Sequence, residues 1–156
     1  MSIDEPINDI GQTTLMLFVQ QSNWPGAKQM LEWKASLNTE DCLGRTPFHF
    51  LAQADATGRF TEWLLKEDAI LASYNINERI NALTTAGVSP LMLAVKLNNP
   101  KVVEHLLNAG ANPFLKDQLG QEAINYKVTL IHTDTKCNSI EEMLNGAKMQ
   151  WLEQVD

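Results

Sequence analysis

Asp41-Cys42-Leu43-Gly44-Arg45-Thr46-Pro47-Phe48-His49 is the stretch that indicates how this chain of 156 residues folds. Its glycine belongs to a series with successive intervals of 33, 43 and 33 residues: Gly11, Gly44, Gly87 and Gly120. The middle interval matches the others once an insertion of ten residues is allowed for. A period near 33 residues is typical of arrays in which small helical units stack on one another. The sequence therefore predicts a repeat architecture.

Each of these glycines precedes a sequence that favours the start of a helix. In Thr46-Pro47 and Ser89-Pro90, a hydroxyl residue stands at the expected N-cap and proline at the first helical position. The hydroxyl can accept a hydrogen bond from a helical N–H, and proline has no N–H to lose there. The glycine suits a turn that needs a positive φ. We expect a second helix to begin near Pro100 and end near Gly110. One such helix pair cannot bury its own apolar face, so the units must stack.

These motifs resemble the ankyrin repeat. The matching segments are Thr46-Pro47-Phe48-His49, Ser89-Pro90-Leu91-Met92 and Leu106-Leu107-Asn108-Ala109-Gly110-Ala111-Asn112. The resemblance implies an all-α, ankyrin-like helical repeat solenoid with short hairpin-like turns between the repeats. It covers residues 8–152 as one domain, with repeats at about 8–40, 41–83, 84–116 and 117–152. A polar lead (1–7) precedes the domain and a short tail (153–156) follows it. The resemblance also implies that His49 is structural and hydrogen-bonds between turns.

Two regions depart from the repeat pattern. Most of the insertion in the second repeat falls within Lys66–Ile80, which is too apolar for a flexible linker. We expect it to fold back as a helical extension that reshapes the face between repeats two and three. In the fourth repeat, Glu122-Ala123 replaces the Thr-Pro pair, and the capping box Ser139-Ile140-Glu141-Glu142 is expected to begin the last helix. A deviant final repeat is expected because an end unit faces water on one side.

The composition argues against several classes of function. Nineteen acidic against 12 basic residues give a net charge of −7, which repels the phosphates of nucleic acid. The chain has no apolar run of about 18 residues to span a membrane, and Met1–Pro6 does not resemble a secretory leader. Two cysteines, Cys42 and Cys137, stand in no CxxC motif and fit a reduced compartment. We therefore expect a cytoplasmic protein, with the nucleus left open as a second compartment.

No arrangement of residues in the sequence supports catalysis. The chain contains no HExxH, GxSxG, P-loop or GxGxxG motif. The carboxylate pair Glu141-Glu142 is more simply explained as the first turn of a helix, where acidic residues favour the helix dipole. We expect a protein that is not an enzyme and needs no metal and no cofactor.

In ankyrin-like stacks, the turn tips and the first helices form a concave face that usually binds the partner. Mapping that face onto this chain selects Ile10, Gln12, Cys42, Leu43, Arg45, Gln53, Ala86, Val88, Lys96, Gln118, Leu119 and Gln121, with Trp24 and Tyr74 as further candidates. The residue before each turn glycine is apolar in all four repeats: Ile10, Leu43, Ala86 and Leu119. If these residues project into solvent, they form an apolar row that marks an interaction site. If they pack against the neighbouring turn, they only seal the stack.

The four tryptophans are expected to include one exposed residue and three packed residues. Trp24 lies before Pro25-Gly26 in the expected loop of the first repeat, so we expect it to be the most exposed and a candidate for binding. We expect the other three to pack in the core or between repeats: Trp33, Trp63 and Trp151.

The sequence thus predicts a protein–protein interaction module that acts as an adaptor. The alternatives are a stoichiometric inhibitor or regulatory subunit of an enzyme, and an assembly chaperone. The negative charge can simply keep the surface solvated, or it can attract a partner protein with a basic surface. We expect the protein to be monomeric by itself. Nothing in the sequence identifies the partner.

Overall fold

The computed structural model describes residues 2–66, 74, 76–127 and 135–154, without the side chains of residues 77–78 and 135–138. This part of the chain is helical and contains no strand. The elements are α1 (Thr14–Gln20), α2 (Trp24–Glu32), α3 (Pro47–Ala54), α4 (Arg59–Lys66), α6 (Ile76–Arg79), α7 (Pro90–Lys96), α8 (Pro100–Asn108), the 3-10 helix η1 (Ala123–Tyr126) and α9 (Thr135–Gln154). The prediction of an all-α helical solenoid is confirmed.

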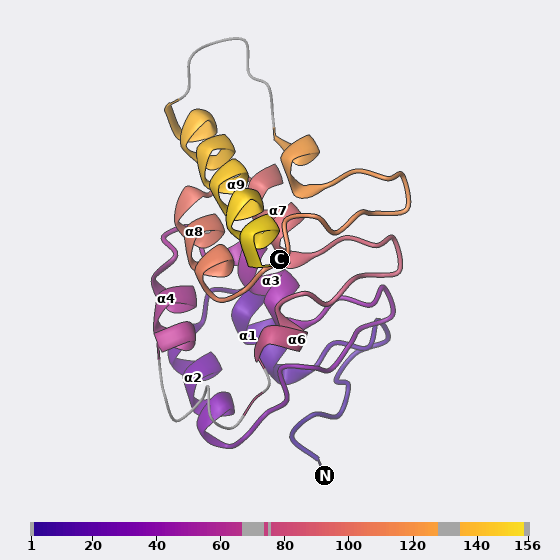
Figure 1. Cartoon of the computed structure of the whole chain (residues 1–156). Coiled ribbons are helices and arrows are strands. Elements are labelled where there is room, and N and C mark those ends of the chain that lie inside the picture. Colours follow the sequence, from indigo (N-terminus) through magenta and orange to yellow (C-terminus); the bar gives the residue numbers. More distant parts are fainter. Residues whose placement is uncertain (1, 67–73, 75, 128–134, 155–156) are drawn as a thin grey trace.

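The helices form two layers beside a column of turns. In the inner layer α1 packs on α3, α3 on α7, and α7 on η1. In the outer layer α4 packs on α8 and α8 on α9, while α2 and α8 also contact the inner helices α1 and α7. The turns that precede the inner helices project to one side of the molecule and lie one above another (Figure 1). This arrangement places four chemically similar turns along one edge of the stack.

The inner helices begin where the sequence predicts. Thr13, Thr46 and Ser89 are the N-cap residues of α1, α3 and α7, and proline occupies the first position of α3 and α7. The Ser89 hydroxyl accepts a hydrogen bond from the Met92 N–H over 3.2 Å. This cap satisfies a helical N–H that has no partner within the helix. Thr13 caps α1 in the same way through the Met16 N–H, so the turns before α1 and α7 enter their helices with a locally fixed direction.

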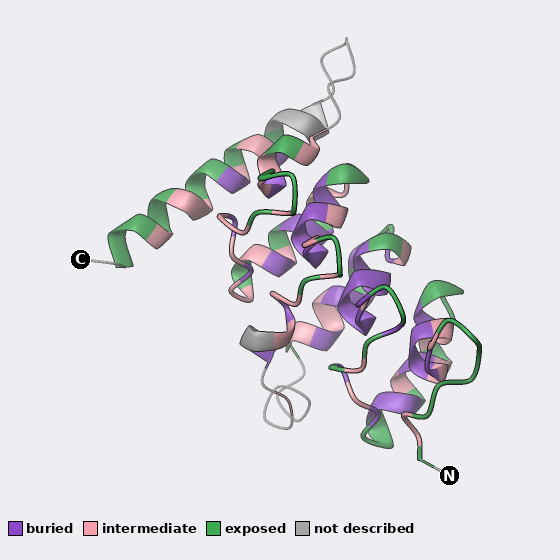
Figure 2. Cartoon of the chain, turned by 90° about the vertical axis from the view of Figure 1, so that its right-hand side faces the viewer, coloured by how far each residue is buried: buried purple, intermediate pink, exposed green. Residues whose placement is uncertain are grey.

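A continuous apolar core fills the space between the two layers. Buried residues gather on the sides of the helices that face one another (Figure 2). Small residues occupy the tightest positions, since Ala27, Ala94 and Ala111 have no exposed surface. The same core continues from Leu15 in α1 to Leu144 in α9. Because each helix pair supplies part of this core, the array holds its turns on a rigid base.

The structure tests the expected start of the last helix and part of the expected helical extension in the second repeat. The helix α9 already begins at Thr135, so the prediction that Ser139 begins the last helix is wrong. A Ser-x-x-Glu sequence also fits a helix interior when the residues before it continue the helix, and that is the case here. Of the expected helical extension in Lys66–Ile80, Ile76–Arg79 forms α6, and Tyr74 donates a hydrogen bond to the Ala35 carbonyl over 2.5 Å. Residues 67–73 and 75 lie outside the described part.

Candidate functional site

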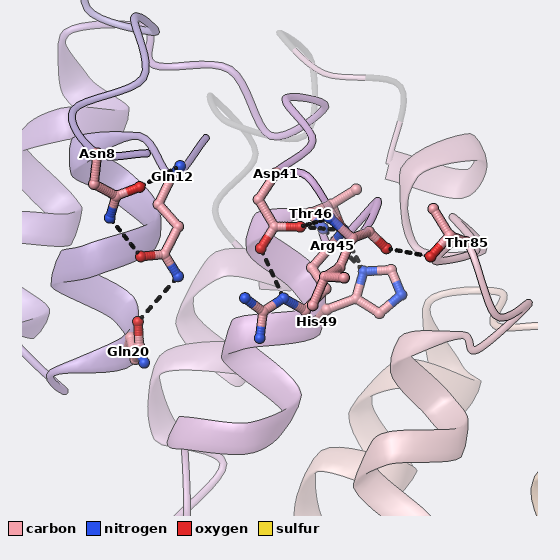
Figure 3. Close-up of polar contacts among 9 residues, drawn as sticks. Asn8, Gln12, Gln20, Asp41, Arg45, Thr46, His49 and Thr85 are labelled. Carbon is pink, nitrogen blue, oxygen red and sulfur yellow. Dashed lines mark hydrogen bonds and ion pairs between the residues drawn. The ribbon is translucent and has the colours of Figure 1, made fainter. Parts of the chain in front are cut away.

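The turns share one hydrogen-bonding pattern. In the second turn, the Asp41 N–H donates to the Arg45 carbonyl over 3.0 Å and the Gly44 N–H donates to the Asp41 carbonyl over 2.9 Å. The Asp41 carboxylate also accepts from the N–H groups of Leu43 and Arg45, and from Arg45 Nε over 2.7 Å. The same two backbone bonds recur in the turns that begin at Thr84 and Asp117. In the first turn the Gly11 N–H likewise donates to the Asn8 carbonyl, but it is the Ile7 N–H that donates to the Gln12 carbonyl. Each turn is therefore a closed loop braced by a side chain, as Figure 3 shows for Asn8 in the first turn and Asp41 in the second.

Consecutive turns are also bonded to each other. The Cys42 N–H donates to the Ile10 carbonyl, the Thr85 N–H to the Leu43 carbonyl, and the Gln118 N–H to the Ala86 carbonyl. These three bonds are 2.9, 3.0 and 3.0 Å long. We call this series the turn ladder. Its second step is the same as the others although ten more residues separate Leu43 from Ala86 than separate Ile10 from Leu43, so the insertion does not interrupt it.

The glycine of each turn has the backbone conformation that the sequence predicts. At Gly87 φ is +78°, and a Cβ atom built there would lie 3.0 Å from the Cα of Asp117 in the next turn. A side chain at this position would be strained, both because the conformation is left-handed and because the next turn approaches so closely. The period of glycines in the sequence thus follows from the left-handed conformation of all four turns and, at Gly11, Gly44 and Gly87, also from the packing of one turn on the next.

His49 joins two repeats beneath the turn ladder. Its Nδ1 accepts from the Thr46 N–H over 3.0 Å (Figure 3). Its Nε2 lies 2.8 Å from the Val88 carbonyl, so Nε2 carries the proton and donates. Burial lowers the pKa of His49 from its ordinary 6.5, because burial disfavours the charged imidazolium. A neutral, doubly bonded imidazole suits the structural role that the sequence predicts, and this prediction is confirmed.

The residue before each turn glycine projects into solvent. The exposed fraction of the side chain is 43% for Ile10, 51% for Leu43 and 83% for Leu119, and Ala86 is exposed as well. We call Ile10, Leu43, Ala86 and Leu119 the tip row. Of the two alternatives that the sequence leaves open, the projecting apolar row is the one observed. Apolar side chains at successive turn tips form a contiguous feature of the kind that marks interaction surfaces.

The remaining candidate residues differ in how far they can be reached. Exposed candidates are Cys42, Gln53, Lys96, Gln118 and Gln121. Half-buried candidates are Arg45, Val88, Trp24 and Tyr74. Gln12 is only 3% exposed, and its side chain bonds to those of Asn8 and Gln20 (Figure 3). Its selection as a contact residue is therefore wrong, because its amide is used inside the first repeat.

Two predictions about the tryptophans are also wrong. Trp24 is the first residue of α2 and stacks on Phe60, with the ring centroids 4.8 Å apart. Trp33, which we expected to pack, is 63% exposed directly after the end of α2. Trp33 is the C-cap residue of α2 and lines an open surface hollow together with Ile3, Pro6 and Met30. Position in the stack decided the exposure of these two rings, and neighbouring sequence could not show it.

Sequence reasoning also missed two exposed apolar residues beside the turns. Ile7 and Leu83 are 52% and 40% exposed, and each immediately precedes the first residue of a turn. They occupy the same position in the first and third repeats, and Glu40 and Lys116 occupy it in the other two. The glycine spacing was a signal that could have found them.

A metal site, a membrane-spanning helix and a free thiol are the other features that could indicate a function in the described part of the chain. Within residues 2–66, 74, 76–127 and 135–154, no group of three or more His, Cys, Asp or Glu residues is placed to hold a metal ion. The helices of this part include none long and apolar enough to cross a membrane. Cys42 is a free, exposed thiol at a turn tip. The tip row is thus the surface with the clearest functional character among the described residues.

Stacked helix pairs joined by a hydrogen-bonded ladder of turns define a helical repeat protein that presents a preformed surface. The family model for ankyrin repeats, in three copies, matches residues 15–117. The chain belongs to the ankyrin-repeat family, whose repeats are protein–protein interaction modules and are typically not enzymatic.

Curated relatives agree with this assignment. The chain is 31% identical over 146 residues to neurogenic locus notch homolog protein 1 of Cricetulus griseus, covering 94% of this chain and 5% of that protein. It is 31% identical over 137 residues to the Danio rerio protein of that name, covering 88% of this chain and 5% of that protein. It is 34% identical over 110 residues to the neurogenic locus Notch protein of Drosophila melanogaster, covering 70% of this chain and 4% of that protein. The chain therefore spans only about a twentieth of the length of these relatives.

Proposed function

We propose that the protein is an adaptor that binds a partner protein through the tip row and the exposed residues of the inner helices. The observation that carries this proposal is the exposure of four apolar residues on turns that are bonded to one another. An apolar side chain held on a fixed backbone loses little conformational freedom when it binds, so more of the burial energy remains as affinity.

The residues around the tip row supply polar contacts for the same interface. Cys42, Thr85 and Gln118 are exposed next to Leu43, Ala86 and Leu119. On the inner helices, Gln53 and Lys96 occupy equivalent positions of α3 and α7 and are exposed. An apolar centre with a polar rim is the usual composition of a protein interface. Half-buried Arg45 and Val88 contribute at the edge of this surface.

Charge supports a partner with a basic surface. The chain carries a net charge of −7, and exposed Asp9 and Glu40 border the first two turns. Opposite charges on two proteins speed their encounter, and salt screens this effect. We expect the association rate to fall as salt is raised; a rate that does not change would remove the electrostatic part of the proposal. We further propose that the protein works in the cytoplasm and is monomeric without its partner.

Affinity capture with matched variants tests the proposal. Wild-type protein is compared with the double variant Leu43→Ser/Leu119→Ser and with Leu152→Ser. Leu152 is 58% exposed, between the values for Leu43 and Leu119, and lies near the end of α9, outside the turns. We expect a stoichiometric partner to bind the wild type and Leu152→Ser and to be lost from the double variant. Equal melting temperatures of the three proteins would show that the loss comes from the surface. Capture that is unaffected in the double variant would contradict the role of the tip row.

The captured partner then separates the adaptor from the two alternatives. An adaptor leaves the activity of its partner unchanged at stoichiometric amounts, whereas an inhibitor or regulatory subunit changes it. An assembly chaperone binds a subunit but is absent from the finished complex. A changed partner activity would replace the adaptor proposal by the regulatory one while keeping the same binding surface.

A further inference from the structure

The tip row has a spacing that selects the kind of segment able to contact all four residues at once. Within a turn, the two arms are paired through the Asp41 N–H and the Arg45 carbonyl, and successive turns are paired through bonds such as Thr85 N–H to Leu43 carbonyl. The distance from one turn to the next is therefore two inter-strand spacings, one between the two arms of a turn and one between neighbouring turns. Each spacing is about 4.7–4.9 Å, so successive tips lie roughly 10 Å apart. The inner helices, which pack at about 8–10 Å, give a similar step.

An α-helix matches this step with one face. Seven residues of helix rise about 10.5 Å, and residues seven apart lie on nearly the same side. A straight helix drifts by about 20° for every seven residues, so the drift over three steps is about 60° and stays within an apolar stripe about 100° wide. A helix laid along the turns can therefore place one apolar residue against each member of the tip row.

Extended segments fit less well. In a β-strand, three residues span about 10 Å, but residues three apart point to opposite faces. A polyproline helix does repeat on one face every three residues, with a rise of about 9 Å. Its known docking grooves are lined by aromatic side chains, whereas the tip row consists of Ile10, Leu43, Ala86 and Leu119. The geometry and the chemistry together favour the α-helix.

We propose that the tip row binds an amphipathic α-helix of the partner whose apolar contact residues recur every seven positions. This inference rests on the proposed function, since it concerns the same surface. The third contact residue of the partner is the largest, because Ala86 leaves more room there than the leucines leave at the neighbouring tips. The half of the partner helix that lies over the first two turns is basic, because it faces the exposed carboxylates of Asp9 and Glu40. The other half lies beside the exposed Lys116 at the last turn.

Designed peptides of known sequence test this inference with the full chain. The first peptide is a labelled helix-forming sequence with Leu, Leu, Phe and Leu at four successive seventh positions and with lysines beside the first two. The second has the same composition, with these apolar residues every fifth position. The third is the first peptide with a proline at its centre, which breaks the helix. The fourth is a proline-rich sequence with leucine at every third position.

Binding is measured by fluorescence anisotropy with wild-type protein, Leu43→Ser/Leu119→Ser and Leu152→Ser. We expect the first peptide to bind at least about tenfold more tightly than the other three, and its affinity to fall by about tenfold or more with the double variant. Leu152→Ser should bind like the wild type. Replacing the peptide's phenylalanine by alanine should weaken binding, while replacing Ala86 by leucine should remove the advantage of phenylalanine.

The outcomes separate this inference from the proposed function. If the third or fourth peptide binds as tightly as the first, or if the seven-residue spacing gives no advantage, the helical partner is wrong while the tip row remains a binding surface. If the first peptide binds the double variant and the wild type equally, the peptide does not use the tip row and the inference fails. The capture experiment with the natural partner stands independently of these results.

Discussion

Replacing Gly87 by alanine tests whether the turns form one continuous ladder, and Gly120→Ala is its matched control. The two glycines have nearly the same φ, +78° and +76°. Holding alanine in this left-handed conformation costs about 1–2 kcal/mol, and the reduced freedom of the unfolded chain offsets about 0.4–1 kcal/mol of that. A Cβ atom at Gly120 would meet nothing within 4 Å. We therefore expect Gly120→Ala to lower the free energy of unfolding by about 1 kcal/mol.

Gly87→Ala carries an additional steric cost. Its Cβ atom would lie 3.0 Å from the Cα of Asp117 and 3.1 Å from the N of Gln118, both in the backbone of the next turn. The next turn must shift away, which stretches the bond of 3.0 Å from the Gln118 N–H to the Ala86 carbonyl. A hydrogen bond of this kind contributes about 0.5–1.5 kcal/mol. We expect Gly87→Ala to lower the free energy of unfolding by about 1–2 kcal/mol more than Gly120→Ala.

Urea unfolding followed by circular dichroism measures this difference, and thermal unfolding provides a second value. For a domain of this size, 1–2 kcal/mol corresponds to about 2–8 °C in Tm. Equal destabilisation by the two substitutions would refute the reasoning, because the backbone of the next turn approaches Gly87 and nothing approaches Gly120 within 4 Å. A loose ladder would also remove the rigid base on which the proposed binding surface depends.

Three further predictions concern other parts of the fold. Burial lowers the pKa of His49 in the folded protein below 6.5, so the unfolded chain binds the proton first as the pH falls. The stability that His49 contributes above pH 6.5 is therefore lost as the pH falls through the folded pKa, by up to about 1.4 kcal/mol per pH unit. Urea titrations between neutral pH and about pH 5 should show that the free energy of unfolding depends less on pH in His49→Gln than in the wild type. Trp24→Ala, which removes the stacking on Phe60, should lower the free energy of unfolding by about 2–3 kcal/mol, whereas Trp33→Ala, at a 63% exposed position, should change it by less than about 1 kcal/mol in the same assay. Gly146→Ala should raise the melting temperature by stabilising α9 by about 1 kcal/mol, because a Cβ atom there meets nothing within 4 Å; an unchanged or lower value would show that the glycine is required within the chain.

Local chemistry explains why so much of the fold could be predicted from the sequence. The conformation of a turn glycine and the cap of a helix depend on a few neighbouring residues. Gly44 and Gly87 have positive φ, and Ser89 caps α7 through the Met92 N–H. These requirements recur in every repeat, so they leave a period that a single sequence displays.

The wrong predictions of side-chain exposure concern contacts that the repeat pattern does not encode. Gln12 occupies the position that Gln121 holds in the fourth repeat, yet Gln12 is buried and Gln121 is exposed. The difference comes from Asn8 and Gln20, which hold the Gln12 amide in the first repeat. The repeat pattern identifies equivalent positions, but it does not show what each end of the stack leaves uncovered.

The insertion shows that the bonding between successive turns does not depend on the number of residues that separate them. Ten additional residues separate Gly44 from Gly87 compared with the other intervals, yet the Thr85 N–H still reaches the Leu43 carbonyl over 3.0 Å. In the sequence the extra residues fall mainly after α4, and residues 67–73 and 75 lie outside the described part. The step between turns is set by the backbone bonds of the turn ladder. Along the tip row the same backbone bond therefore joins each turn to the next, where the sequence has intervals of 33, 43 and 33 residues. For this reason the spacing of the partner's contact residues should follow the turn ladder and not the sequence of this chain.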